Sequence, residues 1–407
     1  MPRTGVAQLF VALVFGLGGC GAETPLSAEN KIDSGAGGGS ASGSATPKPD
    51  GGAGATGMSG NTGVSGNTGA RVLMEPSGRD SPPAFSPELV LLTLVGGVSD
   101  QFIRSVGFNA DGSITASGKG FVVTADAKGR NVKVQGDVTT ADTEGFPSFP
   151  SLPGKPGRLY EDARNGLHYR IGYEQIGGNL QRPIFRAFAS ESATEPLWGF
   201  WEASKSRLEE KRLTADSRCY QVWAMPKGHI GIQCWCDGGN SVLETDPKSL
   251  DDAKTWTDDQ SFQKGAGGTS SLYGLVDPAT GTIVSGTFIG THVAHVITDN
   301  WGRVYGSRPA NQRQTRVGPD NPFGMPENAG AGFFVLDPSL RKVLLNIRLG
   351  GTSETGIQRF AVMAINDQGL LVLGGTSNAP DVPALGEALQ QMAGGGQDGL
   401  LAIIRLW

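Results

Sequence analysis

The chain has no basic clusters, few histidines and, after its first twenty residues, no long apolar run, and each shortage excludes a class of function. No block of lysine and arginine stands out among its 34 basic residues, and the net charge is −5. This distribution argues against nucleic acid or an anionic membrane surface as the main partner. Only four histidines are present, and neither a Ser-His-Asp nor a Cys-His arrangement can be drawn from the spacing. No later segment approaches the length of a membrane span.

The first nineteen residues are expected to be a signal peptide. Arg3 supplies a short positive region, and the 12-residue apolar run Val6–Leu17 is shorter than the roughly 20 residues of a permanent membrane helix. The run ends in Leu17-Gly18-Gly19-Cys20, which resembles the lipobox of bacterial lipoproteins. The resemblance implies that Cys20 becomes the acylated N-terminus, and that palmitate and related chains anchor the protein in the bacterial cell envelope. An ordinary signal peptide with an incidental cysteine is the alternative.

Residues 20–87 are expected to be a lipid-anchored, disordered linker. They consist largely of Gly, Ser, Ala, Thr and Pro and contain almost no large apolar side chains. Such a segment cannot bury enough apolar surface to offset its conformational entropy. Gly21 stands where enteric lipoproteins retained at the inner membrane usually have Asp, so the outer membrane is the expected location.

One hairpin signature recurs five times in residues 88–407: an apolar strand, a tight polar turn that ends in glycine, and a second apolar strand. The turns are Asp111-Gly112, Asn165-Gly166, Lys227-Gly228, Trp301-Gly302 and Gln368-Gly369. Their glycines are 54, 62, 74 and 67 residues apart, and repeats of this length indicate a radially repeated β-architecture. Four hairpins of a second class alternate with these five.

The missing fifth hairpin of the second class is assembled from the two ends of the domain. Gly399–Trp407 matches its first strand, and Pro87–Gly97 matches its second. The prediction is an all-β, five-bladed β-propeller with four strands per blade, closed by pairing of the N- and C-terminal strands, which removes exposed sheet edges. Four or six blades, or a β-sandwich with coincidental spacing, are the alternatives.

Two stretches resemble the bacterial β-propeller repeat often labelled SBBP. Gly96-Gly97 with Asp100, Gly350-Gly351, and Gly395 to Asp398 fit its pattern of paired glycines and an aspartate. The resemblance covers roughly the first and last blades and is weak between them. These repeats occur on exported and surface proteins and carry no agreed catalytic residues, so the resemblance implies the fold and leaves the function open.

Three adjacent blades are expected to carry long links on the rim opposite the glycine turns, at about residues 237–270, 308–331 and 376–397. Long loops on a rigid scaffold commonly hold binding sites. The candidate ligand-binding residues in the first two links are Asp251, Asp252, Trp256, Asp258, Asp259, Arg308 and Arg313. Calcium or a sugar ring stacked on the tryptophan would suit the acidic link, although no EF-hand spacing is present. A solvated loop, ion-paired with the second link, is the alternative.

The cysteines favour a structural role. Besides Cys20, three cysteines remain, an odd number in an exported protein. If Met225 pairs with Ile230 across the hairpin, Cys219 lies opposite Cys236, and a bridge between these two is the prediction. Cys219 with Cys234 is the diagonal alternative, and a thiol redox site is a further one.

Two functions from different classes compete. The first is an envelope-tethered, non-catalytic propeller that binds a protein or a glycan through its long links, without a cofactor other than a calcium ion. The second is an envelope carbohydrate-active hydrolase, which needs paired carboxylates in the funnel. The strands expected nearest the axis contain only Glu161 and Asp162, and adjacent strand residues point to opposite faces. The sequence therefore favours the binding function, and a spacer without a ligand stays open.

Overall fold

The computed structural model describes the greater part of the chain that follows the expected linker. The described residues are 71–73, 81–97, 99–139, 141–142, 158–177, 180–251, 270–289, 295–308, 322–325, 329–352, 358–390, 394 and 396–407. By its contacts the chain divides into Met1–Thr56 and Gly57–Trp407, and every described residue belongs to the second unit. Within the described residues, no helix has the length and hydrophobicity that a membrane crossing requires.

Nearly all regular structure is strand. The strands are β1 (Arg71–Leu73), β2 (Glu88–Val95), β3 (Ser105–Phe108), β4 (Ile114–Ser117), β5 (Phe121–Ala125), β6 (Lys133–Gly136), β7 (Arg158–Asp162), β8 (Leu167–Gly177), β9 (Leu180–Phe188), β10 (Trp198–Gly199), β11 (Ser217–Ala224), β12 (Ile230–Cys236), β13 (Ser270–Asp277), β14 (Thr282–Ile289), β15 (Val296–Thr298), β16 (Val304–Arg308), β17 (Ala329–Leu336), β18 (Val343–Thr352), β19 (Gln358–Ile365), β20 (Leu370–Ser377) and β21 (Asp398–Arg405). One α-helix, α1 (Lys205–Glu210), and two 3₁₀ turns, Pro226–Gly228 and Val242–Glu244, accompany them.

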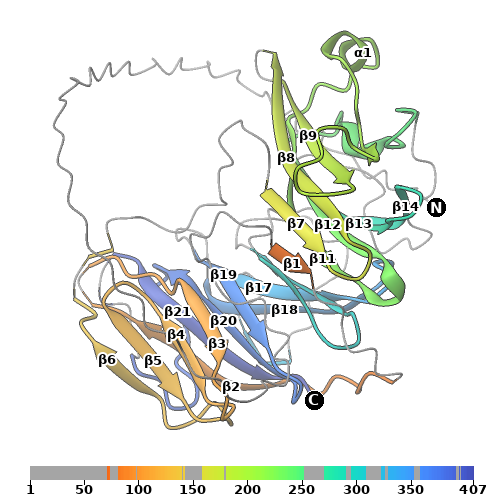
Figure 1. Ribbon diagram of the computed structural model, residues 1–407. Coiled ribbons are helices and arrows are strands. Elements are labelled where there is room, and N and C mark those ends of the chain that lie inside the picture. Colours follow the sequence, from red (N-terminus) through yellow and green to blue (C-terminus); the bar gives the residue numbers. More distant parts are fainter. Residues whose placement is uncertain are drawn as a thin grey trace, which may run out of the picture. The chain divides into compact units, whose positions relative to one another are not determined.

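In the described part of the chain the strands form five sheets, antiparallel except for one short pair, which confirms the predicted five-bladed β-propeller (Figure 1). In chain order the first blade is β3 to β6, the second β7 to β10, the third β11 to β14, and the fourth β15 to β18. The fifth blade has the order β19-β20-β21-β2. The strand nearest the N-terminus of the domain is thus the outermost strand of the last blade, as the sequence predicted. Leu94 lies opposite Leu400, and Glu88 lies opposite Arg405.

A short strand extends the second blade beyond the predicted four strands. Arg71–Leu73, within the segment expected to be linker, pairs in parallel with β7, with Val72 opposite Glu161. The sequence offered no signal for this strand, because three residues are too few to show alternation.

In the fourth and fifth blades an Asx side chain closes the turn of the first hairpin. The carboxylate Oδ1 of Asp299 accepts hydrogen bonds from the backbone N–H groups of Trp301 and Arg303, both at 3.0 Å. The side-chain oxygen of Asn366 closes the corresponding turn of the fifth blade in the same way. In the third blade Met225 stands at this position and gives no side-chain cap. The feature that all five turns share is a glycine with positive φ, which is 79° at Gly302.

The turns of neighbouring blades meet along one rim, which we call the turn rim. Arg164, in the turn of the second blade, donates from Nη1 to the carbonyl of Met225 in the third at 2.7 Å. Gly302 of the fourth blade packs so closely on Pro226 of the third that a Cβ would lie 2.4 Å from it. The opposite ends of the sheets, where the links between hairpins emerge, form the link rim.

Among the described residues, apolar side chains fill the spaces between four pairs of neighbouring blades. Phe185 of the second blade packs in one cluster with Leu272 of the third, and other clusters join the third blade to the fourth and the fifth to the first. Between the fourth and fifth blades, Phe333 and Leu373 are fully buried in one core. Fixed blade-to-blade packing of this kind holds the link rim in place.

The disulfide joins Cys219 to Cys234, so the predicted Cys219–Cys236 bridge is wrong and the alternative pairing is correct. Two register differences account for the error. The hairpin pairs Ala224, not Met225, with Ile230, and a bulge at Tyr220 shifts the register again, so that Cys219 faces Cys234. Cys236 keeps a free, buried thiol opposite Ser217, and burial raises its pKa.

The glycine and aspartate pattern at the end of the domain has a packing explanation. Asp398 is fully buried, and its Oδ2 accepts hydrogen bonds from the N–H of Gly394 at 2.9 Å and from Gln390 Nε2 at 3.4 Å. Its carboxylate crosses Gly96, where a Cβ would lie 2.1 Å from Oδ1. Among the described residues Oδ1 has no hydrogen-bond partner. Burial, and then the charge of Asp100, raise the pKa of Asp398.

We expect Asp398→Asn to stabilise the protein at pH 7. A raised pKa means that the folded state binds this proton more tightly than the unfolded chain, whose Asp titrates near about 3.9. The cost of ionisation therefore appears as pH rises above that value, and it is complete above the folded-state pKa. Replacement should increase the free energy of unfolding by about 1–3 kcal/mol, the cost of an unpaired buried polar atom. Urea unfolding should show this gain at pH 7 and a smaller gain at pH 4.

The matched control is Asp111→Asn at an exposed turn. A hydrogen bond from Ser113 lowers the pKa of Asp111, so its contribution to stability is present above the unfolded pKa and is lost in acid. The control should change stability at pH 7 in the opposite direction. A loss of stability at pH 7 in Asp398→Asn would contradict the expectation.

Candidate functional site

Most of the predicted ligand-binding residues lie outside the described residues. These are Asp252, Trp256, Asp258, Asp259 and Arg313, and the predicted lipidation site Cys20 lies outside them as well. Asp251 is described: its exposed carboxylate accepts a hydrogen bond from Lys211 Nζ at 3.2 Å, an interaction that lowers its pKa. Arg308 ends β16 opposite Gly332. The ion pair that the described residues show for Asp251 is made with Lys211, the residue that follows α1. Most of the second link lies outside the described residues.

The described parts of the long links pack down onto the sheets. In the first link the carbonyl of Pro247 accepts a hydrogen bond from the N–H of Trp201 at 2.7 Å, and Leu243 is fully buried. In the third link Leu385 forms a β-bridge with Leu92 of β2, with hydrogen bonds of 3.0 and 3.1 Å. This bridge covers part of the outer edge of the fifth blade, where an open strand would invite aggregation.

The link rim of the second and third blades presents a cluster of aromatic and charged side chains, which we call the Arg218 cluster. Arg218 of β11 lies directly opposite Trp235 of β12. Its guanidinium carbon lies 5.3 Å from the ring centre of Trp235 and 4.9 Å from that of Tyr173 on β8. Its Nε donates to the side-chain oxygen of Gln181 on β9. Both aromatic rings and the arginine are half-buried, so the cluster has a solvent-facing side.

Two strand ends add carboxylates to this cluster. Asp216 immediately precedes β11 and Asp237 immediately follows β12, and the N–H of Asp237 donates to the carbonyl of Asp216 at 3.2 Å. Asp216 Oδ1 accepts a hydrogen bond from the N–H of Gln181 at 2.8 Å. Burial, and then the nearby charge of Asp237, raise the pKa of Asp216, while Gln181 and Arg218 lower it. Asp237 is exposed.

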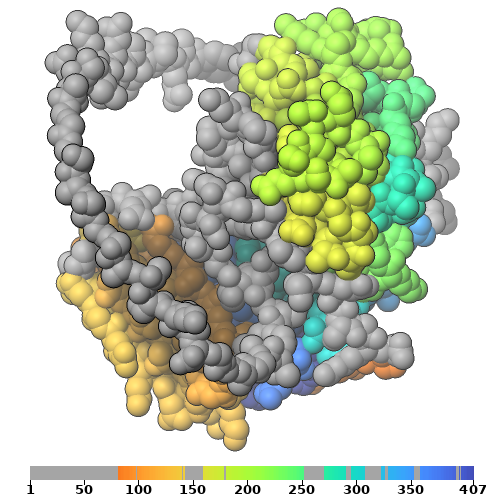
Figure 2. All heavy atoms as spheres, in the orientation of Figure 1, coloured from red at the N-terminus to blue at the C-terminus, as the bar shows by residue number. Residues whose placement is uncertain are grey.

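The β8–β9 hairpin is the scaffold of the cluster. β8 has 11 residues, and only a short connection separates its last residue Gly177 from β9, where the third, fourth and fifth blades carry long links. Figure 1 shows α1 beside the end of this hairpin, and Lys205 of α1 packs on Gly177. In the space-filling view the surface of the second blade, coloured yellow to lime, lies against the green surface of the third (Figure 2).

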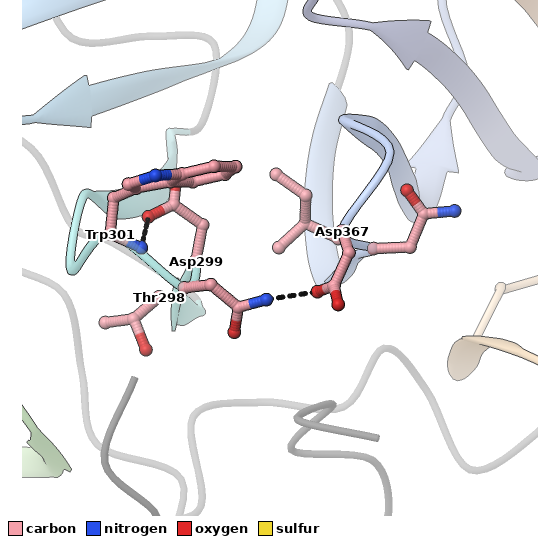
Figure 3. A pocket seen from close by; sticks show the side chains of 7 residues that line it. Thr298, Asp299, Trp301 and Asp367 are labelled. Carbon is pink, nitrogen blue, oxygen red and sulfur yellow. Dashed lines mark hydrogen bonds between the residues drawn. The ribbon is translucent and has the colours of Figure 1, made fainter. Parts of the chain in front are cut away.

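The turn rim of the fourth and fifth blades has a hollow too small for an organic ligand (Figure 3). It is lined by Thr298, Asp299, Asn300, Trp301, Ile365, Asn366 and Asp367. Its volume of about 10 Å³ is close to the space that one water molecule needs. Asn300 Nδ2 donates to Asp367 Oδ1 across it. The hollow is a place where two turns meet.

The described carboxylates of the inner strands are used in structure. Asp162 is fully buried, and its two oxygens accept hydrogen bonds from Arg164 Nε and Nη2, both at 2.8 Å. Glu161 is half-buried on the opposite face, as expected of its neighbour on a strand. Outside the strands, in the segment that follows β6, Asp142 accepts a bidentate pair of hydrogen bonds from Arg104, both at 2.6 Å. In the described part of the chain, no group of three acidic, histidine or cysteine side chains is arranged to hold a metal ion.

Comparisons with known proteins leave the function open. No family model and no curated protein matches the chain. Among solved structures, the chain is similar to an endo-arabinase from Bacteroides thetaiotaomicron, with 11% identity and a TM-score of 0.29 over 78% of this chain and 97% of that one. A gluconolactonase from Xanthomonas campestris has 12% identity and a TM-score of 0.24 over 81% and 99%. The WD40 domain of Pan2 from Neurospora crassa has 13% identity and a TM-score of 0.20 over 79% and 97%. At these TM-scores the similarities carry no argument about activity.

Sequence reasoning missed the Arg218 cluster for a specific reason. The predicted register, in which Met225 pairs with Ile230, placed Asp237 opposite Arg218, whereas the structure places Trp235 there. The correct disulfide would have revealed this pair. Arg218 precedes Cys219 and Trp235 follows Cys234, so pairing the two cysteines also places Arg218 opposite Trp235. The contribution of Tyr173 from another blade has no signature in the sequence.

Proposed function

We propose that this protein is a lipid-anchored, non-catalytic β-propeller of the bacterial cell envelope that binds a protein or a glycan through its link rim. The observation that supports the proposal is the Arg218 cluster, in which two half-buried aromatic rings, an arginine and two carboxylates from adjacent blades share one rim. Aromatic residues and arginine are the side chains most enriched at binding hot spots. The hollow that the described residues form at the turn rim of the fourth and fifth blades has the size of about one water molecule.

Retention of the non-acylated Cys20→Ala chain on isolated cell envelopes tests the proposal, because the lipid anchor would hold the acylated chain there whatever the link rim binds. Each variant below is therefore made in the Cys20→Ala chain for this assay. Trp235→Ala should weaken retention by at least tenfold, because it removes one aromatic wall of the cluster. The matched control is Phe108→Ala, since Phe108 is also a half-buried aromatic residue but ends β3 at the turn rim. Equal retention of the two variants, at equal thermal stability, would overturn the proposed binding face.

A carbohydrate hydrolase is the second candidate, and one observation favours it. Asp216, whose pKa burial raises, lies beside the exposed Asp237, and paired carboxylates perform the acid and base roles in glycoside hydrolysis. Release of reducing sugar from envelope polysaccharide, lost in Asp237→Asn, would establish this function in place of simple binding. Retention without release supports the binding module.

The anchor has its own test at Cys20. Cys20→Ala should abolish incorporation of labelled palmitate, because the thiol is the acylated atom. Cys236→Ala is the control, since that thiol is fully buried. Label that persists in Cys20→Ala would show that the segment is an ordinary signal peptide.

A further inference from the structure

The Arg218 cluster identifies a chemical class of ligand, an inference that rests on the proposed function. We infer that Tyr173, Trp235, Asp216 and Asp237 form a site for a neutral sugar chain. Three properties of the cluster support this assignment: the fixed aromatic surfaces, the free acceptor oxygens and the sign of the charge.

The aromatic surfaces are held in position before any ligand arrives. Arg218 lies against both rings, at 4.9 Å from Tyr173 and 5.3 Å from Trp235, and Gln181 fixes the guanidinium by accepting from its Nε. A side chain that is already immobilised loses little further entropy on binding. The C–H faces of a sugar ring pack on such half-exposed aromatic surfaces, whereas a purely polar ligand would gain nothing from them.

The carboxylates supply the polar half of the site. Asp216 Oδ1 is oriented by the N–H of Gln181 at 2.8 Å, while Asp237 is exposed at the end of β12. Each carboxylate is an acceptor with two oxygens, and a sugar presents adjacent hydroxyl donors. Hydrogen bonds to an ionised acceptor are stronger than those between neutral groups. Aromatic stacking with hydroxyl recognition describes a carbohydrate site.

The charge excludes acidic glycans. The cluster holds two carboxylates and one guanidinium. That guanidinium already donates to Gln181 and contacts the rings of Tyr173 and Trp235. Burial raises the pKa of Asp216, and the nearby charge of Asp237 raises it further, so Asp216 already meets one unfavourable negative charge. A uronic acid or sulfate would add a third negative charge to the same place, and like charges at close range are repulsive. A neutral oligosaccharide meets no such cost.

The test is direct binding of defined oligosaccharides to the full chain, measured by calorimetry and by competition with envelope retention. The probes are neutral oligomers of glucose, mannose and N-acetylglucosamine, with oligouronates as the acidic comparison. We expect neutral oligomers to bind, oligouronates to bind at least tenfold more weakly, and Asp237→Asn to weaken neutral binding by at least fivefold. Trp235→Ala should weaken it by at least tenfold. Phe108→Ala and Asp111→Asn, both at turn-rim positions, should bind as the unaltered protein does.

The outcomes separate this inference from the function on which it rests. Envelope retention that depends on Trp235 but is not displaced by any oligosaccharide would overturn the sugar assignment and indicate a protein partner, while the link rim stays the binding face. Retention that does not depend on Trp235 would overturn both. Because Asp237 is exposed, Asp237→Asn folds whatever its effect on binding, and equal affinities for neutral and acidic oligomers would also overturn the inference.

Discussion

Replacing Arg303 by alanine is expected to lower the free energy of unfolding by about 3–5 kcal/mol, the cost of breaking a buried ion pair from one side. Only 2% of the Arg303 side chain and 3% of the Asp299 side chain are exposed, and their closest atoms, Nε and Oδ2, are 2.5 Å apart. Removing the guanidinium leaves the Asp299 carboxylate buried without its countercharge. Tyr305 donates a hydrogen bond to the same oxygen at 2.9 Å. This neutral hydrogen bond does not replace the charge of the guanidinium.

The same substitution opens an aromatic cage that joins distant parts of the chain. The guanidinium carbon lies 4.4 Å from the ring centre of Phe85, 5.0 Å from Trp301 and 4.6 Å from Trp407. These residues belong to the segment before β2, the turn of the fourth blade and the C-terminus. Cation–π contacts with desolvated arginine contribute up to about 2 kcal/mol each. Arg303 Nη1 also donates to the carbonyl of Pro83 at 3.1 Å, so one side chain holds both ends of the domain.

Equilibrium unfolding in urea measures the loss. Arg405→Ala is the matched control, because Arg405 also pairs near both termini, with Glu88, but the two side chains are 33% and 56% exposed. An exposed pair of this kind contributes less than about 1 kcal/mol. Arg303→Lys should be intermediate, since lysine keeps the charge but loses the planar face and the directed donors. Equal losses in Arg303→Ala and Arg405→Ala would contradict the role assigned to the buried pair.

The architecture could be predicted because its determinants are local. Glycine with positive φ is required at each tight turn, so the five turn glycines mark the hairpins wherever the sequence between them diverges. The apolar run Leu91–Val95 lacked a partner in its neighbourhood, and the run Gly399–Trp407 lacked one as well. Pairing the two runs followed from the count of hairpins, and β2 pairs with β21 as expected.

The disulfide could not be predicted from the same signals. A β-bulge adds one residue to one strand without changing the composition of either, and the extra residue at Tyr220 decides whether Cys219 faces Cys234 or its neighbour. The alternation of polar and apolar residues is too short on either side of the bulge to locate it. Register errors of one residue change which side chains meet across a hairpin, and here they also concealed the pairing of Arg218 with Trp235.

The buried charge at Arg303 shows a second limit. Arg303 contacts residues that are distant in the sequence. Its Nη1 donates to the carbonyl of Pro83, which is more than 200 positions away. Charged residues are usually exposed, so the sequence predicts a surface position for an arginine that follows a turn. Only the closing of the domain by its first strand brings Phe85 and Trp407 to it. The segment before β2, expected to be linker up to residue 87, therefore has ordered contacts from Pro83 onward.

A chain that begins at Gly97, and so lacks β2, is expected not to fold. Leu91, Leu92, Leu94 and Val95 are each no more than 2% exposed, and burying such side chains stabilises a protein by about 1.5–3 kcal/mol each. The combined loss, on the order of 6–12 kcal/mol, is comparable to the whole stability of a domain, about 5–15 kcal/mol. The exposed edge of β21 would also favour aggregation.

A chain that begins at Ser81 is the control, because it keeps β2 together with Pro83 and Phe85. It should unfold cooperatively in urea at the midpoint of the full protein, whereas a chain that begins at Glu88 should lose about as much stability as Arg303→Ala. Adding a peptide of residues 86–97 to the Gly97 chain should recover soluble, cooperatively folding protein, because the hydrogen bonds and apolar contacts of β2 do not depend on its covalent connection. If the Gly97 chain unfolded cooperatively near the native midpoint without the peptide, β2 would be an accessory strand, and the fifth blade would be complete with three.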